Sequence, residues 1–337
     1  MKWNRYFLLI ICFLIGFQVQ GRDKDNLDIK ILENQYMINI EAGVIGSVLS
    51  MREIVYNGKG SDNIISEIEY NVNFQAGTAL GLNFSPIDIF KKMGFSVNSF
   101  FIWYFSTNNG RVVNSDWDEE GIKYSEARAN VSVLSGGEID GSIRFLLPIK
   151  DMVCLQFGVN IYYARFIVAA SDGKIRQSLP GETIYYDTEA INLYGRSMEY
   201  NQEWIVFSPE IGVRGKLGEK RRFEGGINIA ISPLIWGYHI DSHYFRSYDE
   251  NDRRFAYLVY EDKTGNGLYL RARGNVNWKI TKNLLFEANV EYKTILGTRG
   301  DTNIKTTGME GNIYKEKDAA GAEMSNIKFG IIFKVGL

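Results

Sequence analysis

The chain has 337 residues, a formal net charge of -2 and a sequence pI near 5.9. This balance gives no basic surface of the kind that nucleic-acid-binding proteins carry, so it argues against nucleic acid as a partner. Thirty-four glycines, 14% aromatic residues and only five prolines favour many strands joined by tight turns.

The amino terminus reads as a secretory signal peptide. A basic start, Met1 to Arg5, is followed by an apolar run from Tyr6 to Phe17 and by small or neutral residues up to Gly21. The run is shorter than the roughly 20 apolar residues of a membrane-spanning helix, which disfavours a permanent anchor. We therefore expect residues 1–21 to be removed and residues 22–337 to form a single domain. Cys154 is then the only cysteine, so no intramolecular disulfide is expected.

Alternation of apolar and polar residues recurs along almost the whole remaining chain. In Phe286–Lys293 every even position is apolar and every odd position is polar. Successive side chains of a strand point to opposite faces, so each such segment has one apolar and one polar face. The same pattern is seen in these segments: 67–80, in which Ile68, Tyr70, Val72, Phe74, Ala76 and Leu80 share a face; 153–161; 268–278; and 329–337.

Two architectures produce this pattern: a secreted soluble sheet protein, and a transmembrane barrel with lipid outside and polar residues inside. The alternating runs extend over about 12 to 20 residues, whereas strands of soluble domains usually have about 5 to 6. The chain also ends on an alternating segment, Phe329–Leu337, similar to the carboxy-terminal strand of outer-membrane barrels. Both features favour the barrel and a location in the bacterial outer membrane.

The turns set the number of strands. Four short polar turns are expected at 85–88, 148–151, 218–221 and 280–283, and five longer loops near 57–63, 107–124, 170–196, 239–256 and 298–319. Together they predict an all-β fold: a ten-stranded antiparallel transmembrane β-barrel with long extracellular loops. Such a barrel is narrow, and inward Glu, Arg, Asn and Gln side chains can fill it, which disfavours a passive pore.

Two short polar segments are candidates for chemistry. His239 and His243 are the only histidines, and Asp241 lies two residues before His243, so this pair shares one face of an extended chain. A carboxylate that accepts one ring proton leaves the other nitrogen basic, which prepares a general base. Taken alone, the pair reads more simply as a surface histidine with an incidental acidic neighbour. The acidic segment Asn114–Glu119 is likewise weak by itself.

Together, Asn114–Trp117 and Asp241–Tyr244 resemble the omptin family of outer-membrane endopeptidases. Similar segments in the same order are Arg52–Tyr56, Tyr200–Gln202 and Ala320–Glu323, so the resemblance covers nearly the whole mature chain. It implies an extracellular groove that carries an Asp-x-Asp pair on one wall and an Asp-x-His pair on the other. It also implies a hydrolase of polypeptide substrates. The sequence contains no zinc, phosphate or nucleotide motif, so we expect no cofactor and no metal, and we expect a monomer.

Carried over to this chain, the resemblance makes Asp241 the residue that orients His243, and His243 the base for a water that attacks the scissile carbonyl. Asp116 corresponds to the second carboxylate of the opposite pair, but Asn114 stands where the first is expected. An amide can position a water but cannot accept its proton. Either His243 acts with a weaker helper, or Asp118 substitutes, or the protein is a slow or inactive relative.

Specificity is also implied by the resemblance. Omptins usually cut beside basic residues, using carboxylates deep in the groove, and Glu53 corresponds to one of these. His239 replaces the other expected acid, and Ser125 stands where a further one is expected. The resemblance thus predicts a weaker preference for basic residues. An ordinary inward barrel carboxylate is an equally good interpretation of Glu53.

Lipid contact follows the same argument. Family members are activated by lipopolysaccharide held against outward basic residues, and Arg165 corresponds to one of them, with the outward parity of Val153 to Ile161. Tyr163 and Glu203 occupy positions of other lipid contacts, so the lipopolysaccharide site is expected to be partial or absent, with weak or no dependence on that lipid.

One feature of the predicted seventh strand conflicts with a groove-facing pair. Counting by twos from the outward Ile227 and Ile231 places Asp241 and His243 outward as well, unless a bulge at Ser232–Pro233 reverses the phase. The main alternative to an enzyme is a barrel that acts as an adhesin or structural protein, for which Asn114 is the best support. A small-solute channel is the third possibility.

Overall fold

The computed structural model describes residues 38–58, 60–90, 93–150, 153–178, 188–217, 222–244, 257–281, 283–306 and 313–336. The signal peptide expected at residues 1–21 lies outside them. Among these residues, no helix has the length and apolar character needed to cross a membrane. The strand bounds are β1 (Ile38–Tyr56), β2 (Ile64–Phe90), β3 (Met93–Tyr104), β4 (Thr107–Trp117), β5 (Lys123–Lys150), β6 (Val153–Gln177), β7 (Ile191–Leu217), β8 (Phe223–Ser232), β9 (Ile235–Tyr244), β10 (Tyr257–Gly265), β11 (Leu268–Lys279), β12 (Leu284–Leu296), β13 (Arg299–Thr306) and β14 (Ile313–Gly336).

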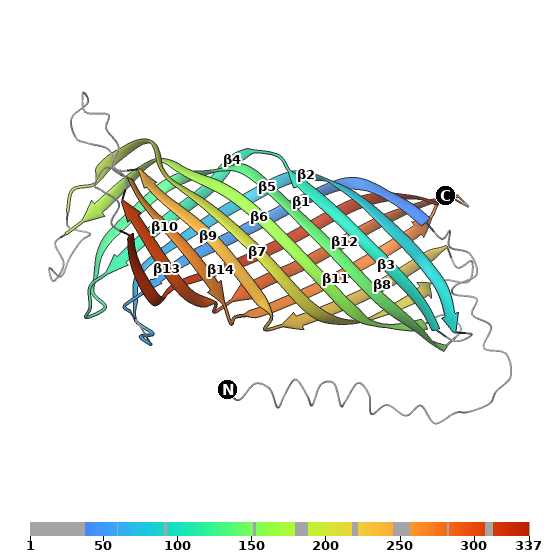
Figure 1. Ribbon diagram of the computed structural model, residues 1–337. Coiled ribbons are helices and arrows are strands. Elements are labelled where there is room, and N and C mark those ends of the chain that lie inside the picture. The colour runs from blue at the N-terminus through green and yellow to red at the C-terminus, as the bar shows by residue number, and fades with distance from the viewer. Residues whose placement is uncertain are drawn as a thin grey trace.

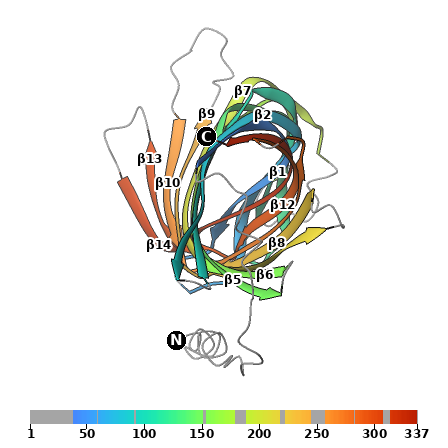
Figure 2. The ribbon, with the colours of Figure 1, turned by 90° about the vertical axis from the view of Figure 1, so that its right-hand side faces the viewer.

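These strands close into an antiparallel ring (Figures 1 and 2). At one end the order is β1, β2, β3, β5, β6, β7, β8, β11, β12 and β14, and β14 pairs back with β1. At the other end β4 replaces β3, and β9, β10 and β13 replace β8, β11 and β12. The described residues thus form the predicted barrel of ten strands, four of which are split into two segments.

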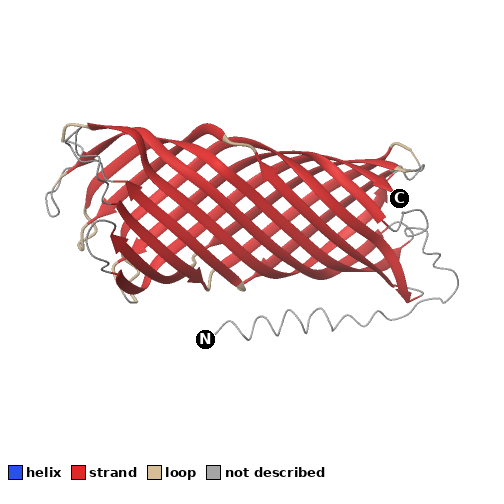
Figure 3. Ribbon diagram, turned by 45° about the horizontal axis from the view of Figure 1, so that its top comes forward, coloured by secondary structure: helices blue, strands red, loops and turns tan. Residues whose placement is uncertain are grey.

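We call the two ends of the barrel the terminal half and the rim half. The terminal half contains β3, β8, β11 and β12 with the adjoining parts of the long strands, including Ile38 and Gly336. The rim half contains β4, β9, β10 and β13, and Tyr56. Figure 3 shows how far the tilted strands extend from one half into the other.

Several predicted loops are strand instead. Residues 107–117, 170–177, 191–196, 239–244 and 299–306 all pair with neighbours, because the strands continue beyond the apolar band. The turn predicted at 85–88 is also wrong, since β2 runs to Phe90, and β5 runs to Lys150 past the start of the turn expected at 148–151. The turn predicted at 280–283 is confirmed, since β11 ends at Lys279 and β12 begins at Leu284, and the turn predicted at 218–221 lies outside the described residues.

The terminal half is apolar outside and ionic inside. Ile331, Phe329 and Ile227 are among its exposed apolar residues. Inside, Lys293 Nζ lies 3.2 Å from Glu138 Oε2 and 3.0 Å from Asp140 Oδ2. Further inward ion pairs of this half are Arg271–Glu291, Arg273–Glu287, Arg144–Glu210, Lys328–Glu138, Lys334–Glu41 and Lys334–Glu287. These opposite charges fill the interior of the barrel, as expected for a narrow one.

The interior of the rim half contains a layer of aromatic side chains in place of the ion pairs of the terminal half. Between Ser47 and Leu49 the β1–β2 register shifts by one residue, because Ser47 pairs with Gln75 but Leu49 pairs with Val72. This bulge splits the face that we predicted for residues 68–80: Phe74 is 52% exposed, whereas Tyr70 is fully buried. The inward side chains here form an aromatic layer, in which Tyr70 stacks on Tyr200 with ring centroids 5.2 Å apart.

Candidate active site

The break between β8 and β9 decides which way the two histidines face. On β8, Ile231 points outward and Ser232 inward, whereas on β9 Ile235 is buried and Trp236 is 56% exposed. Glu210 of β7 pairs with Ala230, but Val206 pairs with Ile235, so the chain gains one residue between the two strands. The phase reversal that a bulge at Ser232–Pro233 would produce is therefore present, and the odd-numbered residues of β9 point inward.

The inward row of β9 contains His239, Asp241 and His243. The His239 ring is fully buried, lies 4.5 Å from the Trp204 ring and hydrogen-bonds through Nε2 to Thr264 Oγ1 at 2.9 Å. Burial lowers the pKa of His239 to about 3, because water no longer stabilises the imidazolium. His239 is thus neutral at physiological pH.

His243 is the more accessible of the two histidines. Its Nε2 hydrogen-bonds to Oδ2 of Asp241, whose side chain is 1% exposed, while the His243 side chain is 22% exposed. Burial alone would lower the pKa of His243, but the charge and hydrogen bond of Asp241, and then the charge of Asp116, raise it. The edge of the ring faces Tyr260, with centroids 5.5 Å apart.

Asn114 and Asp116 lie on β4, which is separated from β9 by β5, β6 and β7 around the ring. Asp116 accepts a hydrogen bond from Ser66 Oγ at 2.7 Å and pairs in register with Ser125 on β5. Its charge raises the pKa of His243 across the barrel, so the two predicted walls approach each other. Asn114 precedes it by two residues and presents a buried Oδ1 that has no hydrogen-bond partner.

Asp118 was considered above as a substitute for the carboxylate missing at Asn114, but its contacts give it another role. Its Oδ1 accepts backbone hydrogen bonds from Glu120 at 3.0 Å and Ile122 at 2.8 Å. This carboxylate therefore shapes the turn between β4 and β5 in place of substituting for Asn114.

Glu53 joins the same cluster from β1. It is 2% exposed, and its pKa is raised well above the usual range by burial, by the charges of Asp241 and Asp262, and by a hydrogen bond to Asp241. The preceding Arg52 instead binds Glu67 at 2.7 Å and Glu323 at 3.1 Å. The structure thus brings Glu53, Asp116, Asp241 and His243 together at the rim half.

Asp262 was missed by the sequence reasoning. It is 3% exposed on β10 and pairs directly with His239. Burial and the charge of Asp241 raise its pKa to about 7, against a hydrogen bond from Thr302 that lowers it. The run Glu261-Asp262-Lys263 resembles a solvated surface segment, and only its pairing with β9 shows that Asp262 points inward. In the sequence, the only signal for this direction is that Asp262 lies two residues after Tyr260 and so shares a strand face with it.

Arg165 lies on the outer surface, as its parity predicted. Its side chain is about half exposed, and its Nε forms an ion pair with Glu203 at 3.1 Å and donates to Asn201 Oδ1 at 3.2 Å. Glu203 thus offsets the charge that would attract an anionic lipid.

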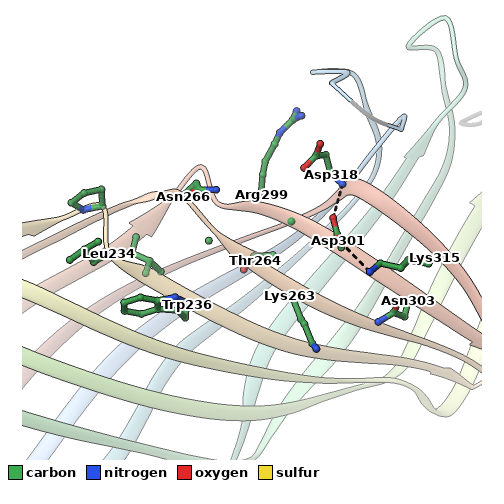
Figure 4. Close-up of a pocket in the computed structure, with 14 residues that line it drawn as sticks. Leu234, Trp236, Lys263, Thr264, Asn266, Arg299, Asp301, Asn303, Lys315 and Asp318 are labelled. Carbon is green, nitrogen blue, oxygen red and sulfur yellow. Dashed lines mark hydrogen bonds and ion pairs between the residues drawn. The ribbon is translucent and has the colours of Figure 1, made fainter. Parts of the chain in front are cut away.

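A separate cavity of about 480 Å³ lies beside the first residues of β9, the last residues of β10 and the first residues of β13 (Figure 4). Trp236, Lys263, Arg299, Asp301 and Lys315 are among its lining residues. His243 is not among them, because it lies at the opposite end of β9.

The ring of strands, with its apolar outer band and filled interior, defines an outer-membrane β-barrel. The chain belongs to the omptin family, whose family model matches residues 34–335. Its fold is similar to that of the outer membrane protease OmpT from Escherichia coli, with a TM-score of 0.75 and 18% identity, over 89% of this chain and 96% of that chain.

Another solved structure, the toluene transporter TodX from P. putida, aligns with a TM-score of only 0.31 and 8% identity, over 89% of this chain and 90% of that one. No curated protein sequence matches the chain. The structural likeness to the protease, at this identity, shows the shared fold alone.

Proposed function

We propose that the protein is an outer-membrane endopeptidase whose rim half faces the cell exterior and hydrolyses polypeptides with a water activated by His243 and Asp241. One observation carries this proposal. His243 hydrogen-bonds to the buried Asp241 on its own strand, and the charge of Asp116 on a distant strand raises the pKa of His243. Family membership supports the same reaction class.

In the proposed reaction, Asp241 Oδ2 accepts the Nε2 proton of His243, which leaves Nδ1 as the basic nitrogen. A water between His243 and Asp116 attacks the scissile carbonyl carbon while His243 takes its proton. His243 then delivers that proton to the leaving amine, so that the base is regenerated. Asn114 can orient the water through its amide but cannot take a proton, so turnover is expected to be slow for this reaction class.

The test is cleavage of a mixed peptide library by the folded protein and by His243→Ala. Loss of the general base should reduce kcat/KM by at least about 100-fold, since such bases contribute about 10² to 10⁴. Ser242→Ala, on the neighbouring position that points the other way, is the matched control and should retain activity. Cleavage that persists unchanged in His243→Ala would show a contaminating protease and refute the mechanism.

Asn114 favours a second candidate function, a catalytically inactive barrel that acts as an adhesin or structural protein. Its amide, whose Oδ1 is buried without a hydrogen-bond partner, supports this candidate because an amide cannot take a proton from water. Absence of cleavage in both the native protein and His243→Ala would support this candidate.

A further inference from the structure

The reaction proposed for the rim half creates a negative charge close to several acidic side chains. When a water attacks a peptide carbonyl, an electron pair of the C=O double bond moves to the oxygen, which becomes an oxyanion. The proposed water lies between His243 and Asp116, beside the buried carboxyl groups of Asp241, Glu53 and Asp262. Carboxylates repel an oxyanion, so the reaction needs a hydrogen-bond donor that carries no negative charge.

Two basic side chains neighbour this cluster along the chain, and both are engaged elsewhere. Arg52 binds Glu67 at 2.7 Å and Glu323 at 3.1 Å. Lys263 follows Asp262 on β10, but it lines the separate cavity of Figure 4. Both cations therefore point away from the carbonyl that the water would attack, which favours an uncharged donor.

We propose that the Tyr260 hydroxyl donates the hydrogen bond that stabilises the oxyanion of the tetrahedral intermediate. This inference rests on the proposed endopeptidase function and adds a catalytic residue to it. The water oxygen bonds to the carbonyl carbon, His243 takes a proton of the water, and the carbonyl oxygen takes the electron pair. Tyr260 keeps its own proton throughout. The intermediate collapses when the C=O double bond forms again and the amine leaves with the proton from His243.

Tyr260 lies beside the proposed base. It pairs directly with Asp241 across β9 and β10, and its ring meets the His243 ring edge to face, with centroids 5.5 Å apart. Diagonal neighbours on paired strands are within reach of aromatic side chains. The charge of Asp116 acts on both rings, so both side chains lie toward the opposite wall of the groove. The phenol hydroxyl can therefore reach the oxygen of a carbonyl whose carbon is attacked by a water on His243.

The Tyr260 hydroxyl is a protonated and available donor. Burial, followed by the charges of Asp241, Glu53 and Asp116, raises the pKa of Tyr260 to about 12, so the phenol keeps its proton at neutral pH. Within the part of the chain that the structure describes, no group accepts a hydrogen bond from it. The acids that would repel an oxyanion thus hold the phenol in the form that donates to one.

The carboxyl cluster acts on three tyrosines that differ in accessibility. The charges of Asp241 and Glu53 also raise the pKa values of Tyr70 and Tyr200, after the larger effect of burial. Those two rings are fully buried and stack on each other. Tyr260 is partly exposed, so it is the one of the three that a bound peptide can touch.

The first test is Tyr260→Phe, which removes the hydroxyl and keeps the ring. For a peptide that the native protein cleaves, kcat should fall by about 100-fold, the lower end of the cost of one lost oxyanion donor. KM should change by less than about threefold, because the carbonyl oxygen carries its full negative charge only after the attack. If the ring merely packs against His243, Tyr260→Phe should keep its kcat and Tyr260→Leu should lose it. That result would refute the proposal.

Tyr238→Phe is the matched control. It removes the same hydroxyl from β9, the neighbouring strand, but on the outward face, where the charges of Glu261, Lys305 and Glu203 act on it. Its kcat and KM should equal those of the native protein. Circular dichroism and the heat-dependent gel mobility of folded barrels check that each variant is folded.

Binding of two uncleavable peptide analogues gives a second readout. A phosphinate carries a tetrahedral, negatively charged group at the scissile position, whereas a ketomethylene of the same sequence keeps a planar, neutral carbonyl. Tyr260→Phe should bind the phosphinate about 10- to 100-fold more weakly than the native protein does, and the ketomethylene equally well.

The two readouts separate this inference from the proposed function. If the native protein cleaves no peptide, the proposed function fails, and the binding comparison still decides the role of Tyr260. Equal binding of the phosphinate to the native protein and to Tyr260→Phe would overturn that role. A native protein that binds neither analogue would overturn it as well.

Discussion

The terminal half and the rim half are built from the same ring of ten strands, yet they handle buried charge in opposite ways. In the terminal half, Lys293 lies within 3.2 Å of carboxylate oxygens of Glu138, Asp140 and Glu291. In the rim half, Glu53, Asp241 and Asp262 are buried together on an aromatic layer. The paired charges of the terminal half neutralise one another, whereas the raised pKa values of Glu53 and Asp262 are typical of a functional site.

The largest expected effect comes from breaking the terminal network. Lys293→Met removes a cation that contacts three buried carboxylates, while Lys328 and Arg271 still contact them, so the free energy of unfolding should fall by about 3 kcal/mol, the lower end of the cost of breaking a buried ion pair. Urea unfolding in lipid vesicles measures this loss. Once folded, the variant should still cleave peptides, because the rim half retains its cluster.

Lys305→Met is the control for that substitution. Lys305 pairs with Glu261 in the rim half and is 41% exposed, so its loss should cost less than about 1 kcal/mol. Equal destabilisation by the two variants would contradict the division of the barrel into a charge-neutralised half and a reactive half.

A smaller effect is expected when the rim half gains its missing acid. Asn114→Asp places a proton acceptor two residues from Asp116, on the wall opposite His243. We expect kcat to rise by about 10- to 100-fold, within the range of general-base catalysis. Steady-state kinetics on one peptide measure this gain, and Ser115→Asp, at the intervening position, is the control that adds the same charge on the other face. No gain, or an equal gain in both, would show that Asn114 does not limit the reaction.

The sequence was sufficient for the barrel because lipid imposes a local rule. Alternation in Phe286–Lys293 and in Phe329–Leu337 follows from one face meeting hydrocarbon, and each strand carries this signal by itself. It was insufficient for the register. The one-residue shift between Ser47 and Leu49 and the break after Ser232 each depend on which residue the neighbouring strand offers, which a single segment does not encode.

The residues of the candidate site also differ in whether a single segment of sequence is enough to identify them. Asp241 and His243 could be found because both lie on one strand, and Asp116 because it belongs to a short motif. Asp262 could not, since its inward direction follows from pairing with His239 across a hairpin. A cluster assembled from β1, β9 and β10 is a property of the closed ring.

The smallest expected effect is a shift of the pH profile of cleavage. It tests whether the buried carboxylate Asp241 in the rim half controls the protonation of His243. His243 must be neutral to accept a proton, and its pKa is raised above the usual 6.5 by Asp241 and then Asp116, against the effect of burial. Cleavage of a peptide without ionisable side chains should therefore increase as the pH rises through that raised pKa. Asp241→Asn removes the largest raising influence, so its remaining activity should reach a plateau at lower pH. A profile that stays in place, or that moves to higher pH, would mean that Asp241 does not set the protonation of His243 and that the carboxyl cluster is not coupled to the base.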